Sequence, residues 1–301
     1  MSQSLISWRV RQRNAWLLGL APSLFVLTVL TLVPALALVV TSFTPFSLTH
    51  PESTFTFTHP LVNYQQLLHD SRFLDSIGTQ LKLSCVSVFF QVVIGLLLAL
   101  LLNGTSRILN TARTLLLIPM VLPPIIVALI WKIIYTPDIS PLHQLLDRAG
   151  YPLDSLIANP NTALWAIAVA DIWQWFPFTL LMVLAALQMI PNDPQEAAKL
   201  DGAHRFNIFR FIILPHLKPV LAVCVLFRLI DSFKAFPLIY VLTDGGPGSI
   251  TEVTNYYGFI QAFNFSYWGY GSAIAVVILV GVFILSWLIG RMGWNDDRTT
   301  H

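Results

Sequence analysis

Charged residues are scarce in this 301-residue chain: they make up 11% of it, whereas hydrophobic residues make up 55%. Soluble domains carry about 25% charged residues, so this deficit and a mean hydropathy of +0.70 exclude an ordinary soluble protein. The net charge of +2 lacks the basic excess of nucleic-acid-binding proteins, and no nucleic-acid partner is expected. The composition indicates an integral membrane protein, with the lipid bilayer as its surroundings.

Residue patterns that build disulfide, metal, nucleotide and catalytic sites are also missing. The two cysteines, Cys85 and Cys224, lie in apolar segments, which does not indicate a disulfide framework. The seven histidines are not spaced as metal ligands. The sequence has no GxxxxGK[ST] motif, no dinucleotide fingerprint and no Ser-His-Asp or Cys-His set. We therefore expect no cofactor, metal or catalytic residue on this chain, and no ATP site of its own.

Six apolar segments are each long enough to cross about 30 Å of hydrocarbon. They are Trp16–Phe43, Leu81–Leu102, Thr114–Tyr135, Ala163–Met189, Leu217–Leu242 and Ser272–Arg291. We predict an all-α protein with one domain of six transmembrane helices over residues 16–291, preceded by a segment at 1–15 and followed by a tail at 292–301. The first apolar run is about twice as long as the hydrophobic region of a signal peptide, so we expect it to remain as a membrane span. The minor alternative is cleavage after the tripeptide Ala35-Leu36-Ala37.

Arginine and lysine are distributed unevenly between the loops. If both termini are cytoplasmic, eleven of these residues lie on the cytoplasmic side, whereas Arg72 and Arg148 lie on the other. Cytoplasmic loops of membrane proteins carry the excess of basic residues. We therefore predict that both termini are cytoplasmic, together with a polar loop at residues 190–216.

This cytoplasmic loop carries signals for two short helices. Asp193 can cap a helix, Pro194 suits its first position, and Glu196 stands three residues after the cap. Gly202 can adopt a left-handed backbone conformation at little cost, so it is expected to end the first helix. A second short helical run is expected at about Arg205–Phe211, before the next span.

Two spans carry polar side chains on one helical face each. These residues follow the i, i+3, i+4, i+7 spacing of one helical face. They are Asp171, Gln174, Trp175 and Phe178 in the fourth span, and Arg228, Asp231, Ser232 and Ala235 in the fifth.

A charge at the bilayer centre costs on the order of 3 kcal/mol or more. Carboxylates and amides hydrogen-bond hydroxyl groups, and the aromatic rings offer flat apolar surfaces, so we predict that both faces line the path of a polyhydroxylated ligand. The alternative is that Asp171, Arg228 and Asp231 only neutralise one another between helices.

The cytoplasmic loop also matches a longer pattern: Glu-Ala-Ala, three residues, Gly, nine residues, Ile, one residue, Leu-Pro. This pattern is met by Glu196, Ala197, Ala198, Gly202, Ile212, Leu214 and Pro215. It resembles the EAA motif of permeases in binding-protein-dependent ABC importers. The resemblance extends from about Asn63 to Arg291, includes Thr243 with Gly245-Gly246-Pro247, and is strongest to carbohydrate permeases related to the maltose and glycerol-phosphate importers. Gly78-Thr79 departs from the family pattern, which usually has Asn-Thr there.

The resemblance implies an ABC type I importer permease in the bacterial inner membrane. It implies four kinds of partner: a second homologous permease, two copies of an ATP-binding subunit, an extracytoplasmic solute-binding protein, and a sugar, oligosaccharide or polyol as substrate. ATP and Mg²⁺ would be bound and ATP hydrolysed on the ATP-binding subunits. The loop would be a coupling helix that inserts into those subunits, through Glu196, Ala197, Ala198, Asp201, Gly202, Leu214 and Pro215. The maltose permease also implies that the eight polar-face residues surround the ligand.

Three other functions stay open at this point. An ABC permease for a polyamine or a phosphate ester would use Arg228 as an anion site. An ion-coupled secondary transporter would use the carboxylates of Asp171 and Asp231. A structural membrane protein would tolerate Glu196→Lys and Gly202→Asp without any transport defect.

Overall fold

The computed structural model describes residues 2–50, 52, 56–151 and 154–295. Within these residues the regular secondary structure is helical, and the bridged pair Ser47 and His50 does not extend into a strand. The predicted all-α fold is therefore confirmed. The chain divides into two compact units, residues 1–66 with 261–276 and residues 67–260 with 277–301.

The first unit joins the N-terminal helix to the start of the last one. Its elements are α1 (Ser2–Ser42), the larger part of α2 (Val62–His69), most of the π-helix η3 (Ile260–Asn264) and the first residues of α13 (Trp268–Asn295). The Nδ2 atom of Asn63 donates to the carbonyl oxygens of Ser42 at 2.9 Å and Thr44 at 2.8 Å. A Cβ atom at Gly269 would collide with the carbonyl oxygen of Thr44. The close approach of these two turns therefore requires glycine at position 269.

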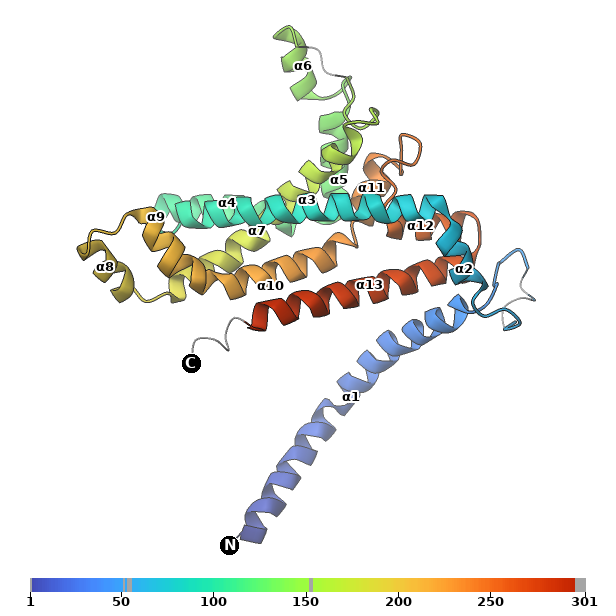
Figure 1. Ribbon diagram of the computed structural model, residues 1–301, viewed down its shortest axis with the longest axis horizontal. Coiled ribbons are helices and arrows are strands. Elements are labelled where there is room, and N and C mark those ends of the chain that lie inside the picture. The colour runs from blue at the N-terminus through green and yellow to red at the C-terminus, as the bar shows by residue number, and fades with distance from the viewer. Residues whose placement is uncertain (1, 51, 53–55, 152–153, 296–301) are drawn as a thin grey trace. The chain divides into compact units, whose positions relative to one another are not determined.

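The second unit is a bundle built around two long helices, α3 and α7. Its elements are α3 (Ser71–Leu101), α4 (Arg107–Val121), α5 (Pro124–Tyr135), α6 (Pro141–Arg148), α7 (Ala163–Met189), α8 (Asp193–Leu200), α9 (Arg205–Ile208), the π-helix η2 (Phe209–Ile213), α10 (Leu214–Ser232), α11 (Phe236–Leu242), α12 (Thr254–Phe259) and the rest of α13. Helices α3 and α7 lie side by side, and α10 packs against both (Figure 1). These three helices surround the polar residues described below.

Gly95 of α3 allows the close crossing of α3 and α7. A Cβ atom at this position would lie 2.6 Å from the Cβ atom of Thr179 and 2.9 Å from the carbonyl oxygen of Phe176. Small residues let the backbones of membrane helices approach closely. The crossing is extended by an apolar cluster that includes Ala99, Leu180 and Val183, each 0% exposed.

Within the described residues, five helical stretches are long and apolar enough to cross a membrane. They are Gly19–Ser42, Ser71–Leu101, Ala163–Met189, Arg205–Ser232 and Trp268–Arg291. Helices α4 and α5 pass the same test together, which gives up to six spans if they count as one. The fourth predicted segment coincides with α7 at both ends.

The prediction of one helix over Thr114–Tyr135 is wrong. Helix α4 ends at Val121 and α5 begins at Pro124, and the two helices are bent by 98°. Pro123 and Pro124 have no backbone N–H, and the residue before a proline is disfavoured in the α conformation. The two prolines therefore break the span, although the segment is apolar throughout.

The predicted fifth span, Leu217–Leu242, is also two helices. Helix α10 ends at Ser232, and α11 begins at Phe236 with a proline in its first turn. Pro237 has no backbone N–H with which to continue a helix from α10, but it suits the first turn of a new helix, where that N–H would have no partner.

Several helices start earlier than the hydrophobicity predicts, α1 and α3 by the widest margins. Helix α1 begins at Ser2, and α3 begins at Ser71, ten residues before the predicted start at Leu81. The carboxylate of Asp70 caps α3, because it accepts hydrogen bonds from the backbone nitrogens of Arg72 and Phe73 at 3.0 and 3.2 Å. The first turns of α3 are therefore helical although they are polar, so hydrophobicity does not reveal them.

Candidate functional site

The loop at residues 190–216 contains the first predicted helix, with one correction at its start. Helix α8 runs from Asp193 to Leu200, so Asp193 is its first residue and Asn192 is its cap. The predicted capping role of Asp193 is wrong: Asn192 already has helical backbone angles, and no side chain makes a capping hydrogen bond. Glu196 lies in the first turn, where a negative charge interacts favourably with the helix dipole.

The end of α8 has the predicted glycine turn. Gly202 has a φ angle of +79°, in the left-handed region. Its backbone nitrogen donates to the carbonyl of Lys199 at 3.1 Å, and that of Ala203 donates to Ala198 at 2.9 Å. This pair of bonds is the Schellman motif, which satisfies the last carbonyl groups of the helix. The prediction that Gly202 ends this helix is confirmed.

The second helical run is not separated from the next span. Helix α9 passes into η2 and then into α10, which begins at Leu214. Pro215 cannot donate a backbone hydrogen bond, and Leu214 instead donates to Phe209, five residues earlier. A π-turn of this kind accommodates the interruption without ending the helix. The predicted end of the run at Phe211 is therefore wrong.

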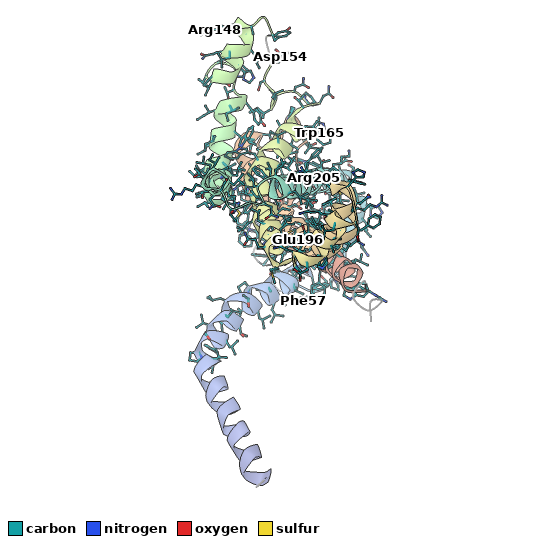
Figure 2. All side chains as sticks on the ribbon, turned by 90° about the vertical axis from the view of Figure 1, so that its left-hand side faces the viewer. Phe57, Arg148, Asp154, Trp165, Glu196 and Arg205 are labelled. Carbon is teal, nitrogen blue, oxygen red and sulfur yellow. The ribbon has the colours of Figure 1, made fainter. Side chains whose placement is uncertain are left out.

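The surface of this loop has unusually little support from the rest of the chain. Helix α8 contains no buried residue, and its last residue, Leu200, is 89% exposed. On α9, Phe206 is 66% exposed. Figure 2 views the unit from this side, with Glu196 and Arg205 toward the reader. An exposed surface that combines large apolar side chains with a carboxylate is typical of a docking site for another protein.

The predicted coupling residues fall into two groups. Glu196, Ala197, Asp201 and Gly202 are exposed on α8 and its closing turn, and Ala198 is half-buried there. Leu214 and Pro215 lie apart from them, at the start of α10. Five of the seven residues therefore share one short segment.

A buried chain of hydrogen bonds links α3, α7 and α10. Gln91 Nε2 of α3 donates to Asp171 Oδ2 of α7 at 2.8 Å. Arg228 Nε of α10 donates to Gln91 Oε1 at 2.9 Å. Asp171 is 4% exposed and Arg228 is 1% exposed. A buried charge needs such partners, because an unpaired charge in an apolar environment is strongly unfavourable.

Arg228 also contacts an aromatic ring and a second carboxylate. Its guanidinium carbon lies 4.3 Å from the centroid of the Trp175 ring, within the range of a cation–π interaction. Its Nη1 atom lies 3.3 Å from Asp231 Oδ2, and Lys234 Nζ lies 3.3 Å from the other oxygen of Asp231. Arg228 and Asp231 thus pair directly, whereas Asp171 reaches Arg228 through Gln91.

The other predicted residues of the two faces lie outside this chain of contacts. Ser232 Oγ is 2.8 Å from Ser84 Oγ, Gln174 Nε2 donates to the carbonyl of Leu122 at 3.2 Å, and Phe178 lies against Phe227 with ring centroids 6.4 Å apart. Ala235 is not on the face of α10, because the helix ends at Ser232. The predicted position of Ala235 on the i+7 row is therefore wrong.

The residues that sequence reasoning missed come from α3. Gln80, Ser84, Ser87 and Gln91 are buried, and Gln80 Nε2 donates to Ser84 Oγ at 2.9 Å and to the carbonyl of Ser232 at 3.1 Å. Their spacing of four, three and four residues places them on one helical face. The same periodicity that identified α7 and α10 could therefore have identified α3.

The loop between α11 and α12 forms a second polar network. Arg72 of α3 donates from Nε and Nη2 to the two oxygens of Glu252, at 2.7 and 2.5 Å. Tyr256 donates to Asp244 at 2.6 Å. Burial and this hydrogen bond raise the pKa of the Tyr256 hydroxyl above its ordinary value. The network fastens the loop to the start of α3.

The fold and both polar regions can now be compared with known proteins. The sequence profile of the family described as binding-protein-dependent transport system inner membrane component matches residues 91–293. The chain belongs to this family. It is therefore an inner-membrane transport component with multiple membrane-spanning helices, as predicted.

Individual members of the family support this assignment over most of the chain. The chain is 38% identical over 243 residues to the trehalose/maltose transport system permease protein MalF of Thermococcus litoralis, covering 80% of this chain and 81% of that protein. It is 34% identical over 261 residues to the sulfoquinovosyl glycerol transport system permease protein SmoG of Agrobacterium fabrum, covering 86% and 83%. It is 33% identical over 234 residues to the trehalose transport system permease protein SugA of Mycobacterium tuberculosis, covering 77% and 74%.

A solved structure shares the fold. A chain of a bacterial ABC transporter that imports the acidic polysaccharide alginate superposes with a TM-score of 0.82 at 20% identity, covering 98% of this chain and 99% of that one. The predicted ABC type I importer permease fold is confirmed by this likeness.

Proposed function

We propose that this permease carries a sugar, oligosaccharide or polyol across the inner membrane. The observation that carries the proposal is the polar cluster of Asp171, Gln91, Arg228 and Trp175 among apolar helices. Carboxylate, amide and guanidinium groups can bind hydroxyls, and an aromatic face can bind the C–H face of a sugar ring. Relatives that transport trehalose, maltose or sulfoquinovosyl glycerol support the same substrate class.

The energy for transport would come from partner subunits. We propose that two ATP-binding subunits, holding ATP and Mg²⁺, dock against the exposed α8 surface, and that a second permease completes the pathway. A solute-binding protein would deliver the ligand from outside, as the family description indicates. ATP binding would draw the α8 segments together and open the pathway outward, and hydrolysis would return it to the inward state. Directional transport requires that these states differ in their affinity for the ligand.

The experiment is reconstitution with the cognate ATP-binding subunit, second permease and solute-binding protein, followed by ATP hydrolysis measurements with a panel of sugars and polyols. We expect at least one carbohydrate to stimulate hydrolysis and to be taken up. Stimulation by a polyamine or a phosphate ester alone would contradict the proposed substrate class.

The site is tested by Asp171→Ala and Asp231→Ala. Both are expected to abolish uptake while the complex still assembles. The control is Asp147→Ala, which removes an exposed carboxylate of α6 and should leave uptake unchanged. Normal uptake by both site variants would exclude these residues from the pathway.

A further inference from the structure

We propose that Arg228 occupies the place of the ligand on the face of Trp175, and that Gln91 is the positioning residue that holds it there. This inference rests on the proposed function, in which the indole of Trp175 receives the apolar face of a sugar. It adds that Arg228 competes with the sugar for the Trp175 ring. It also adds that a third helix, α3, determines the position of Arg228 through Gln91.

The aromatic face is already covered. The guanidinium carbon of Arg228 lies 4.3 Å from the Trp175 ring centroid. Arg228 is 1% exposed, and cation–π contacts are stronger where water is excluded. A sugar ring and a guanidinium group cannot stack on the same side of one indole at the same time. Binding of a sugar to this side therefore requires that Arg228 move.

Gln91 fixes the guanidinium in this position. Its Oε1 accepts from Arg228 Nε at 2.9 Å, while its Nε2 donates to Asp171 Oδ2 at 2.8 Å and to the Asp171 carbonyl at 3.2 Å. The bonds on the two sides of the amide determine its orientation, because the oxygen must face Arg228 and the nitrogen must face Asp171. Gln91 is 0% exposed, so water does not replace these bonds.

The displaced guanidinium would keep a partner. Asp231 lies 3.3 Å from Arg228 Nη1 and its side chain is 41% exposed. Arg228 can therefore leave Trp175 while it remains paired with Asp231. Competition of this kind weakens ligand binding, and a transport pathway needs a site that a ligand can leave as well as enter.

The position of Arg228 can be tested without any ligand. The assembled importer is labelled with 5-fluorotryptophan, and the ¹⁹F resonance of Trp175 is assigned from its loss in Trp175→Phe. Gln91→Leu should shift this resonance, because Arg228 loses its tether. The control Ser76→Ala removes a buried hydroxyl of α3 that donates to the carbonyl of Phe73 in the same helix, and it should leave the resonance in place. An unchanged resonance in Gln91→Leu would overturn the positioning role.

The variant Gln91→Asn provides a second test in case the importer with Gln91→Leu does not assemble. In Gln91→Asn the amide is one methylene shorter and cannot reach both partners, so it should shift the Trp175 resonance as Gln91→Leu does. Gln91→Glu keeps an oxygen that accepts from Arg228, but its other oxygen faces the Asp171 carboxylate where the amide nitrogen donated, so it should shift the resonance less than Gln91→Leu without restoring the wild-type position. If neither expectation holds, Gln91 does not position Arg228.

Competition is tested by titration with trehalose, maltose and sorbitol in separate experiments. For a sugar that shifts the Trp175 resonance, the midpoint should be about tenfold lower in Gln91→Leu than in the wild type, and unchanged in Ser76→Ala. Equal midpoints in wild type and Gln91→Leu would overturn the proposal.

The titration also separates the inference from the proposed function. If a sugar is transported by the reconstituted importer but never shifts Trp175 in any variant, the inference fails and the proposed function stands. If no sugar or polyol is transported, the proposed function fails.

Discussion

The α8 segment and the loop between α11 and α12 both reverse the chain at the edge of the second unit, but they are stabilised differently. The α11–α12 loop has its own partners: Glu252 is 3% exposed and is bound by Arg72, and Tyr256 is bound to Asp244. Helix α8 has no buried residue, and Leu200 is 89% exposed. One loop is held by partners within the chain, whereas the other leaves its surface exposed.

This difference predicts that changes in α8 affect transport and changes in the α11–α12 loop affect stability. The largest effect is expected for Glu196→Lys and Gly202→Asp. Each should reduce uptake to background, because the surface proposed to receive the ATP-binding subunit is altered, while the thermal stability of the isolated chain stays the same. Uptake by cells and thermal unfolding of the purified chain measure the two quantities.

The matched control for these variants is Asp147→Lys, a charge reversal at an exposed carboxylate of α6. It should leave uptake unchanged. If Glu196→Lys and Gly202→Asp instead unfolded the chain and left no folded protein to assay, the distinction between the two loops would be lost.

The next largest effect is expected for Arg72→Ala, which leaves the carboxylate of Glu252 buried without its bidentate partner. Loss of one member of a buried ion pair costs about 3–5 kcal/mol. The Arg72 side chain is 44% exposed, so we expect about 2 kcal/mol after screening by solvent. Thermal unfolding of the assembled complex measures the loss.

An exposed pair provides the comparison for Arg72→Ala. His50 and Glu52 lie 3.3 Å apart with both side chains 74% exposed. Glu52→Gln should not change stability measurably, because exposed pairs contribute little. Equal effects of Arg72→Ala and Glu52→Gln would show that the α11–α12 network does not stabilise the fold.

A smaller effect is expected for Gly202→Ala. A residue with a Cβ atom in the left-handed region costs about 1–2 kcal/mol, and this cost falls on α8, which is not packed against the bundle. We expect a partial loss of uptake per ATP hydrolysed, and a milder loss for Gly202→Asn, since asparagine tolerates this conformation. Gly281→Ala is the control, because a Cβ atom there meets nothing within 4 Å. If Gly281→Ala caused a defect as large as that of Gly202→Ala, the left-handed turn at Gly202 would have no specific role in coupling.

The smallest effect is expected for Tyr256→Phe, which removes the hydrogen bond to Asp244. Such a bond stabilises the fold by about 1 kcal/mol. Because the pKa of Tyr256 is raised above its ordinary value of 10.0, this contribution should be constant below pH 10 and decline above it, as the unfolded tyrosine ionises first.

The measurement for Tyr256→Phe is thermal unfolding of both proteins between about pH 7 and 11. Tyr151→Phe, at a side chain that is 72% exposed, should match the wild type throughout. A difference between wild type and Tyr256→Phe that grew above pH 10 would contradict the direction of the pKa shift.

The sequence by itself determined the features that depend on local chemistry. Hydrophobicity indicated a membrane protein and predicted the bounds of α7, because an apolar stretch of that length has few other stable environments. The backbone freedom of Gly202 predicted the end of α8, since the left-handed conformation is a property of single residues. The EAA pattern that begins at Glu196 indicated the family, because a motif of fixed spacing can be recognised from neighbouring residues alone.

Only the tertiary structure decided how the helices share their polar groups. Periodicity placed Asp171 and Arg228 on helix faces, but the partner between them, Gln91, comes from a helix 80 residues away from Asp171 along the chain. Pairing of buried charges is a property of several helices packed together, so it cannot be worked out from any one of them.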